Sequence, residues 1–310
     1  MTPRAASHVL LVAPNDYRTN TETAESNAFQ HAVAPAEAAA LAARAVEQHR
    51  RLRDQLIENG VQVTVARSLR ETPDAAFCNN WFSTHQSAAG AQATLVLYPM
   101  MAPSRRLERR PELVRMLSQW YPRQIDYSSR EADQVFLEST GSLCLDDTNR
   151  VAYAAISIRT DLGLTREWAR ALNYRLVAFD ATDAAGLPYY HTNVMMFLGH
   201  GLAGICLDSI TETGRAGMAG RRDVLASLEQ GGFDILPITR DQVMVFCGNG
   251  LPLVNDLGEA LLVMSTAAYG GFADTERATI GRHARIVHTD LSAFETLGGG
   301  SARCLLGELF

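Results

Sequence analysis

The sequence predicts an α/β fold that forms a single domain over residues 1–310. Segments with strand character alternate with helical segments along the whole chain, as they do in α/β proteins. No stretch rich in Pro and Ser and no charged low-complexity tract divides the chain into parts. In addition, five polar motifs interrupt strand-like runs at nearly constant intervals, which indicates a repeated module.

Strands and helices are expected in alternation from the N-terminus onward. The apolar run Val9–Val12 predicts a short buried strand. An Ala-rich helix with arginines on its polar face is expected over Pro35–Asn59, and Gly60 ends it. Alternating β-branched residues predict a strand at Val61–Ala66. The later helices, with strands between them, are expected at Pro111–Gln119, Leu164–Leu172, Arg221–Gln230 and Ala273–Arg282.

The five motifs are represented by Asn80, Glu138, His191, Asn249 and Cys304, which follow one another at intervals of 58, 53, 58 and 55 positions. A unit of this length can hold a strand, a helix and a hairpin. The spacing therefore predicts modules around a common axis, each contributing the polar end of a strand to one shared centre. An open doubly wound sheet is the competing architecture, but the segment after the first strand contains no glycine for its phosphate-binding loop.

The composition excludes several classes of function. All 28 basic residues are arginine, so the chain has no lysine for a Schiff base, a pyridoxal-phosphate anchor or a P-loop. Covalent catalysis must therefore use another nucleophile. The net charge of −6 and the pI of about 5.8 argue against a nucleic-acid partner, because phosphate binding needs a basic surface.

The sequence also predicts a compartment. The N-terminus lacks the apolar stretch and cleavage site of a signal peptide, and no run reaches the roughly 18 apolar residues of a membrane span. The five cysteines are odd in number, widely spaced and free of CxxC pairs. Such cysteines are typical of cytoplasmic proteins with free thiols and no structural metal. We therefore expect a cytoplasmic protein without a membrane partner.

Cys304 is the strongest candidate for the nucleophile. Three consecutive glycines, Gly298–Gly300, precede it and permit the close backbone approach that presenting a side chain to a ligand requires. Arg303 adds a positive charge that could favour the thiolate. The alternative role of a cysteine is that of a small buried apolar residue, which we expect for Cys144, Cys206 and Cys247.

His191 and Glu138 are the candidate partners of Cys304. His191 lies in a strand-like run in which it shares a face with Asn193, and a histidine near neutrality can shuttle the proton of a cysteine. Glu138 ends an apolar run and could accept the second ring proton of His191. The alternatives are a hydrogen-bonded core histidine and a carboxylate that caps a turn. Among the other histidines, only His85 could line a site.

Taken together, the motifs resemble those of the guanidine-modifying pentein superfamily, which includes arginine deiminases, dimethylarginine dimethylaminohydrolases and amidinotransferases. The resemblance covers nearly the whole chain and rests on Phe77–Asn80, Leu137–Gly141, His191–Asn193 and Gly298–Cys304. It implies a five-bladed α/β propeller of ββαβ modules with pseudo-fivefold symmetry. Within the superfamily the chain is most similar to the arginine-deiminase-related branch of citrulline-utilisation hydrolases.

The resemblance implies a cofactor-independent mechanism. Cys304 attacks the central carbon of a guanidino or ureido group and forms a covalent intermediate. His191 protonates the departing amine and then activates water, while Glu138 supports His191. Arg159 corresponds to an arginine that binds the substrate carboxylate, and Arg105 or Arg106 matches a second one. Asn20 and Asn27 are expected to close the site.

The departures from better-known members of the superfamily bear on the substrate. Asn79, Asn80 and Asn193 stand where cation-binding members carry acids. A guanidinium has only donors and is held by carboxylates, whereas a neutral ureido group also carries an acceptor. The three asparagines therefore favour citrulline as substrate. Alternatively, asparagines simply suit turns, and Asp74 could supply one carboxylate.

The sequence thus predicts a cysteine hydrolase that converts citrulline to ornithine, ammonia and carbon dioxide. Its expected partner is a small amino-acid substrate, and a homo-oligomer is left open. An amidinotransferase and an enzyme of the arginine deiminase or dimethylarginine hydrolase type are the first alternatives. A non-catalytic propeller that binds a macromolecule is the alternative from another class.

Overall fold

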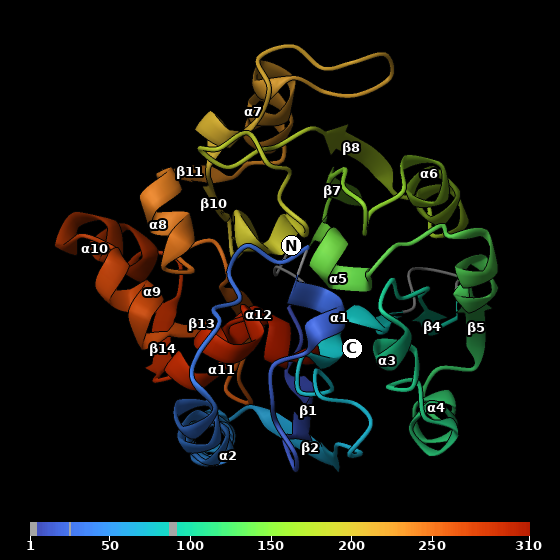
Figure 1. Cartoon of the computed structure of the whole chain (residues 1–310). Coiled ribbons are helices and arrows are strands. Elements are labelled where there is room, and N and C mark those ends of the chain that lie inside the picture. Colours follow the sequence, from blue (N-terminus) through green and yellow to red (C-terminus); the bar gives the residue numbers. More distant parts are fainter. Residues whose placement is uncertain (1–4, 25, 87–91) are drawn as a thin grey trace.

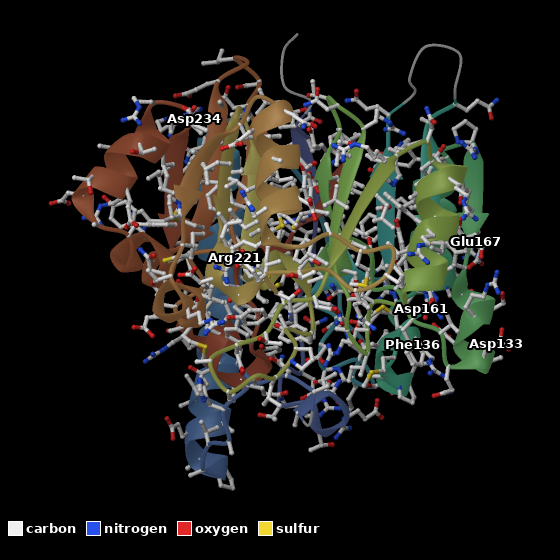
Figure 2. The ribbon with its side chains drawn as sticks, turned by 90° about the horizontal axis from the view of Figure 1, so that it is seen from above. Asp133, Phe136, Asp161, Glu167, Arg221 and Asp234 are labelled. Atoms are coloured by element: carbon white, nitrogen blue, oxygen red, sulfur yellow. The ribbon has the colours of Figure 1, made fainter. Side chains whose placement is uncertain are left out.

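The computed structural model describes residues 5–24, 26–86 and 92–310. Its strands form five separate three-stranded sheets, which lie around a common centre with the longer helices on the outside (Figure 1). Figure 2 shows side chains filling the space between the sheets, whereas the exposed acids Asp133, Glu167 and Asp234 lie at the periphery. The predicted α/β fold is confirmed.

All five sheets have the same topology. The first strand pairs antiparallel with the second, and the second pairs parallel with the third across a helical connection. This is the ββαβ module that the resemblance implied, and its length accounts for the motif spacing. The sheets, each from its first to its third strand, are β15 (Gly307–Leu309), β1 (His8–Ala13) and β2 (Gln62–Arg67); β3 (Phe82–His85), β4 (Thr94–Leu97) and β5 (Arg123–Asp126); β6 (Cys144–Asp146), β7 (Val151–Ala155) and β8 (Arg175–Phe179); β9 (Met196–Gly199), β10 (Leu202–Ile205) and β11 (Asp234–Pro237); and β12 (Leu251–Val254), β13 (Ala260–Ser265) and β14 (Arg285–Thr289).

The helices that connect the second and third strands include the five predicted ones, each within two residues of its expected ends. The longest begins at Pro35, whose fixed φ and missing N–H suit the first turn, and the chain leaves it through Gly60 at φ +78°. No helix in the described ranges is both long and apolar enough to span a membrane. The helices between the second and third strands are α1 (Thr21–Ala24), α2 (Pro35–Glu58), α3 (Pro103–Arg106), α4 (Pro111–Ser118), α6 (Leu162–Ala171), η4 (Leu207–Ser209), α7 (Arg221–Gln230), α9 (Thr266–Gly271) and α10 (Asp274–Gly281). Three more helices follow the third strand of a sheet: η2 (Ser128–Asp133), α8 (Arg240–Met244) and α11 (Ser292–Gly298).

The polar motifs form tight turns directly before the first strand of each sheet. Four of these turns are short helices and the fourth in chain order is a non-helical turn at 245–248. The helical turns are η1 (Cys78–Asn80), α5 (Ser139–Ser142), η3 (Thr192–Val194) and α12 (Ala302–Leu305). The strand predicted through His191 is therefore wrong, because this residue precedes η3 and β9 begins only at Met196.

Hydrogen bonds join the five turns into a closed ring at the centre of the molecule. Each turn bonds to the next one along the chain, and the last bonds back to the first. The side chains satisfy backbone and amide groups that would otherwise be buried without partners. In order around the ring, the bonds are Asn79 to Thr140 at 3.3 Å, Thr192 to Ser142 at 2.6 Å, Asn249 to Asn193 at 2.8 Å, the Arg303 N–H to Asn249 at 3.0 Å, and Cys78 to Leu305 at 3.5 Å.

Candidate active site

A small cavity of about 20 Å³ beside the ring of turns contains most of the predicted site residues. A larger cavity of about 210 Å³ lies elsewhere and reaches Asn193 and Arg303, but it includes no candidate catalytic group. We place the active site at the smaller cavity because reactive side chains converge there. The predicted residues that line it are Asn27, Asp74, Asn80, Arg105, Arg159, His191, Gly298–Gly300 and Cys304.

The glycine run before Cys304 is required by close packing. A Cβ added at Gly298 would lie 2.4 Å from atoms of Tyr17 and Phe77, and Gly299 has a φ of +61°. These contacts leave no room for a side chain. The run therefore lets α12 approach the cavity and place Cys304, which is 4% exposed, on its wall.

The thiol of Cys304 is surrounded by amides. The Nδ2 groups of Asn249 and Asn193 lie 3.4 and 4.0 Å from its Sγ. Burial raises the pKa of Cys304, although the Ser301 and Asn249 hydrogen bonds oppose the shift. The positive charge of Arg303 lowers the pKa of Cys304 in the direction expected, while its guanidinium also pairs with Glu308 at 2.7 Å. The resting side chain is therefore a thiol rather than a thiolate.

His191 and Glu138 form the predicted pair. Their Nε2 and Oε2 atoms lie 2.8 Å apart, and both side chains are almost completely buried. Burial would raise the pKa of Glu138, but the nearby Arg159 guanidinium, at 3.6 Å, and His191 together hold it well below its usual value. Burial lowers the pKa of His191 to about 4, although Glu138 opposes this shift. At neutral pH the pair is an ionised carboxylate and a neutral imidazole.

This arrangement fixes the tautomer of His191. A carboxylate only accepts hydrogen bonds, so the proton of the neutral ring lies on Nε2. The other nitrogen, Nδ1, is then a free base. It faces Gly141, because a Cβ added there would lie 2.7 Å from Nδ1. His191 can therefore accept a proton at Nδ1 while Glu138 stabilises the resulting cation.

The three predicted asparagines occupy different places. Asn80 lines the cavity, with its Oδ1 2.8 Å from Arg105. Asn193 lies in η3, outside the cavity lining, with its Nδ2 4.0 Å from Cys304 Sγ. Asn79 bonds to Thr140 and does not line the cavity. Sequence reasoning gave no role to Asn249, although its motif was one of the five; the signal was its position in the repeat.

Two of the three predicted substrate-binding arginines lie at the cavity and one does not. Arg159 and Arg105 both line the cavity, whereas Arg106 donates to the carbonyls of Met100 and Met101 outside it. Arg159 packs over the ring of Tyr190 at 4.9 Å.

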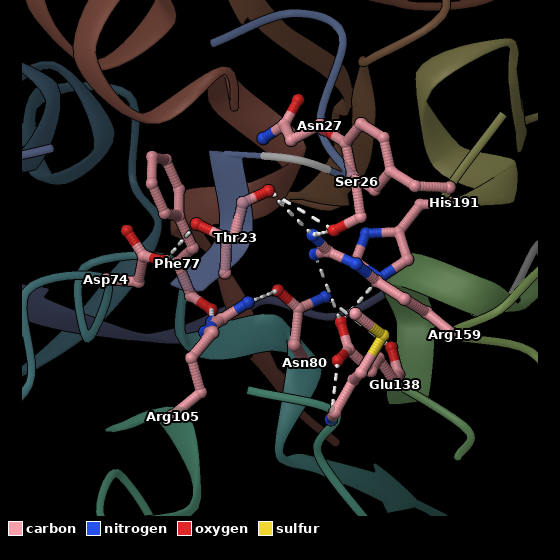
Figure 3. A network of polar contacts seen from close by, with 12 residues as sticks. Thr23, Ser26, Asn27, Asp74, Phe77, Asn80, Arg105, Glu138, Arg159 and His191 are labelled. Carbon is pink, nitrogen blue, oxygen red and sulfur yellow. Dashed lines mark hydrogen bonds and ion pairs between the residues drawn. The ribbon is translucent and has the colours of Figure 1, made fainter. Parts of the chain in front are cut away.

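Asp74 accepts hydrogen bonds from Asn20 at 2.9 Å and Thr23 at 3.2 Å through Oδ2. Asn27 bonds to the Gly298 carbonyl at 3.0 Å. Thr23 and Asn27 of the N-terminal segment therefore line the cavity, whereas Asn20 does not, and Glu25 lies outside the described residues. Figure 3 shows this network, with Asn80 between Arg105 and Glu138.

His85 does not contribute to the cavity. Its ring bonds to Ser83 at 2.8 Å and packs near Trp168 and Tyr174. The described residues contain no group of three or more His, Cys, Asp or Glu side chains placed to hold a metal ion.

Solved structures that share this fold include an arginine dihydrolase, a complex with L-arginine and a dimethylarginine dimethylaminohydrolase. ArgZ is an arginine dihydrolase from the ornithine–ammonia cycle in cyanobacteria. Its N-terminal domain, solved with bound substrate, has a TM-score of 0.73 and 16% identity over 97% of each chain. AgrE in complex with L-arginine has a TM-score of 0.72 and 17% identity, over 99% of this chain and 40% of AgrE. A dimethylarginine dimethylaminohydrolase adduct with S-methyl-L-thiocitrulline has a TM-score of 0.63 and 15% identity, over 98% of this chain and 100% of that enzyme. The fold is that of the pentein superfamily, as predicted.

The sequence comparison is more specific. Residues 13–310 match the sequence model of the eukaryotic N,N-dimethylarginine dimethylhydrolase family, and the chain belongs to that family. No curated protein sequence matches it significantly. The protein is thus a cysteine-dependent hydrolase of C–N bonds other than peptide bonds, in a family whose members hydrolyse guanidino-type amino acids. The predicted enzyme class is confirmed, while the citrulline-utilisation branch stays a prediction.

Proposed function

We propose that the protein hydrolyses the ureido side chain of citrulline to ornithine, ammonia and carbon dioxide, with Cys304 as the nucleophile. The observation that carries this proposal is the kind of polar group around the thiol. The amides of Asn193 and Asn249 contact Sγ, and the amide of Asn80 lines the same cavity. Amides donate and accept, so they suit a neutral ureido group, whereas a guanidinium has only donors.

The carboxylate nearest to the catalytic histidine is already occupied. Glu138 accepts from His191 at 2.8 Å and from the Met101 N–H at 3.0 Å, and it pairs with Arg159. A guanidinium placed there would compete with these partners and would lie close to a second cation. A neutral substrate avoids both costs.

We assign the two ends of the amino-acid backbone to Arg159 and Asp74. Arg159 Nε and Asp74 Oδ1 are both buried without a hydrogen-bond partner. Unsatisfied buried polar atoms are costly, and a zwitterionic amino acid would satisfy both through its carboxylate and its ammonium group. Because the cavity of about 20 Å³ is smaller than an amino acid, substrate entry requires lining side chains such as Thr23 and Asn27 to move.

In the proposed reaction His191 moves the protons. Its Nδ1 takes the thiol proton while Cys304 Sγ forms a bond to the ureido carbon. The proton passes to the terminal nitrogen, the C–N bond breaks, and ammonia leaves an S-carbamoyl intermediate. His191 then deprotonates a water molecule, which attacks the same carbon and releases the thiolate for reprotonation. The product, ornithine with a carboxylated side-chain nitrogen, loses carbon dioxide. Glu138 stabilises the imidazolium at each step.

A second candidate is hydrolysis of arginine. The unpartnered Oδ1 of Asp74 favours it, because a cavity-lining carboxylate oxygen can accept from a guanidinium. ArgZ, which shares the fold, is an arginine dihydrolase.

Incubating the purified protein separately with citrulline, arginine and dimethylarginine separates these functions. We expect ornithine, ammonia and carbon dioxide in equal amounts from citrulline, with Cys304→Ala as the inactive control. Ammonia from arginine but none from citrulline would refute the proposal and support the second candidate.

We further propose that the five sheets are the blades of an α/β propeller that forms one domain over residues 1–310. The shared ββαβ topology, the ring of turns and the pairing of β15 with β1 support this arrangement. One cooperative unfolding transition by calorimetry is expected, whereas two separable transitions would contradict a single domain.

A further inference from the structure

Arg105 and Glu108 form a buried ion pair beside the active site. Both residues are 3% exposed. The guanidinium bonds to both carboxylate oxygens, through Nε at 2.8 Å and Nη2 at 3.0 Å. Such a fork holds the plane of the guanidinium in one orientation.

The remaining bonds of Arg105 leave it little capacity to bind substrate. Nη2 also donates to the Phe77 carbonyl at 2.8 Å, and Nη1 donates to Asn80 Oδ1 at 2.8 Å. Four of the five N–H groups of this arginine are therefore used within the protein. The single remaining one cannot form the two-pronged contact that an arginine makes with a substrate carboxylate.

The contact with Arg105 determines which end of the Asn80 amide faces the catalytic groups. A guanidinium has no acceptor, so the atom of Asn80 that it meets must be the oxygen. The NH2 group then points to the opposite side, where Nδ2 lies 3.5 Å from the Glu138 carbonyl. A Cβ at Gly141 would lie 2.3 Å from this Nδ2 and 2.7 Å from His191 Nδ1, so the NH2 group lies next to the catalytic base.

We infer that the Arg105–Glu108 pair is a positioning device that orients the Asn80 amide as a hydrogen-bond donor to the substrate and thereby selects a ureido group over a guanidinium. This inference rests on the proposed function. A donor at this place meets the carbonyl oxygen of a ureido group but opposes the N–H groups of a guanidinium. Reversing the amide would bring two donors together at Arg105, so the pair prevents the orientation that a cation would need.

The first test is the charge-neutral double variant Arg105→Gln with Glu108→Gln. A glutamine at 105 can donate or accept, so the Asn80 amide is no longer held in one orientation. We expect the ratio of kcat/KM for citrulline to that for arginine to fall at least about tenfold. Arg105→Lys keeps a cation with donors only. It should therefore keep the ratio within about threefold of the wild type, even where kcat falls.

The matched control removes another mostly buried ion pair that does not contact Asn80. Arg109 and Glu131 lie 2.7 Å apart, with side chains 13% exposed. The variant Arg109→Gln with Glu131→Gln should lose thermal stability but keep the substrate ratio. A similar change of ratio in this control and in the Arg105/Glu108 variant would overturn the inference.

Asn80→Asp tests the same inference without disturbing the ion pair. Aspartate still accepts from Arg105 but presents an acceptor, not a donor, to the substrate. We expect this variant to shift the ratio toward arginine at least about tenfold. An unchanged ratio in Asn80→Asp would also overturn the inference.

Calorimetric binding of citrulline and arginine in a Cys304→Ala background gives the ratio of the two dissociation constants, which should change in the same direction without turnover. The proposed function fails if the wild type produces no ornithine from citrulline. The inference about Arg105 and Glu108 fails by itself if the wild type turns over citrulline but the citrulline-to-arginine ratio is unchanged in the Arg105/Glu108 double variant and in Asn80→Asp.

Discussion

Replacing Gly141 with alanine should impair catalysis although it removes no polar group. Gly141 lies in α5, between the Asn80 amide and the His191 ring. The added Cβ would lie 2.3 Å from Asn80 Nδ2 and 2.7 Å from His191 Nδ1, whereas ordinary contacts begin at 3.4 Å. Asn80 must therefore move by about 1.1 Å (3.4 − 2.3) and His191 by about 0.7 Å (3.4 − 2.7) if each takes up its own overlap.

These displacements set the size of the effect. A misplacement of about 1 Å at a reacting group costs on the order of 100-fold in rate, which corresponds to about 2.7 kcal/mol of transition-state stabilisation. We expect kcat/KM for citrulline to fall by about this factor. The thermal midpoint should fall as well, because the site is closely packed.

Ornithine release measured over a range of citrulline concentrations gives kcat/KM for each variant. Gly281→Ala is the matched control, because Gly281 ends α10 and an added Cβ there meets no atom within 4 Å. This control should keep wild-type activity. If Gly141→Ala retained activity within about threefold of the wild type, the inferred crowding of Asn80 and His191 would be refuted.

Three further predictions concern single side chains. Cys304→Ala should lose at least about 1,000-fold in citrulline turnover with an unchanged circular dichroism spectrum, and residual turnover above that level would exclude Cys304 as the nucleophile. Arg159→Ala should raise KM for citrulline at least about tenfold, whereas Arg106→Ala, outside the cavity, should leave KM unchanged; equal effects in steady-state kinetics would contradict the assignment of the carboxylate site. The free energy of unfolding should fall as the pH drops from about 6.5 to about 4, because the fold keeps His85 and His191 neutral with pKa values lowered to about 3 and 4, while the unfolded chain protonates them near 6.5. Urea titrations at several pH values should show that the free energy of unfolding of His85→Gln depends less on pH than that of the wild type. An equal pH dependence in the two proteins would argue against a buried neutral ring at His85.

Much of the fold could be predicted because its signals are local. The Ala-rich composition of α2, with Pro35 at its start and Gly60 after its end, favours a helix through local signals alone. The repeat was visible because each module places a polar turn before the first strand of its sheet. The conformation of the turns was less predictable. The apolar run around His191 has the composition of a strand. However, the Thr192 hydroxyl and the Asn193 carbonyl bond to neighbouring turns, and the segment forms the short helix η3 instead.

The sequence by itself indicated the repeated architecture and the proposed catalytic residues, Cys304, His191 and Glu138, because these predictions depend on residue type and spacing. Only the tertiary structure decided the roles of Arg105 and Arg106. Adjacent residues in a helical turn point about 100° apart, so only one of them can face the cavity, and packing between modules determines which. The orientation of the Asn80 amide was likewise decided by Arg105 from another segment of the module. In the proposed function, the choice between ureido and guanidino substrates depends on that contact, which cannot be read from residue types alone.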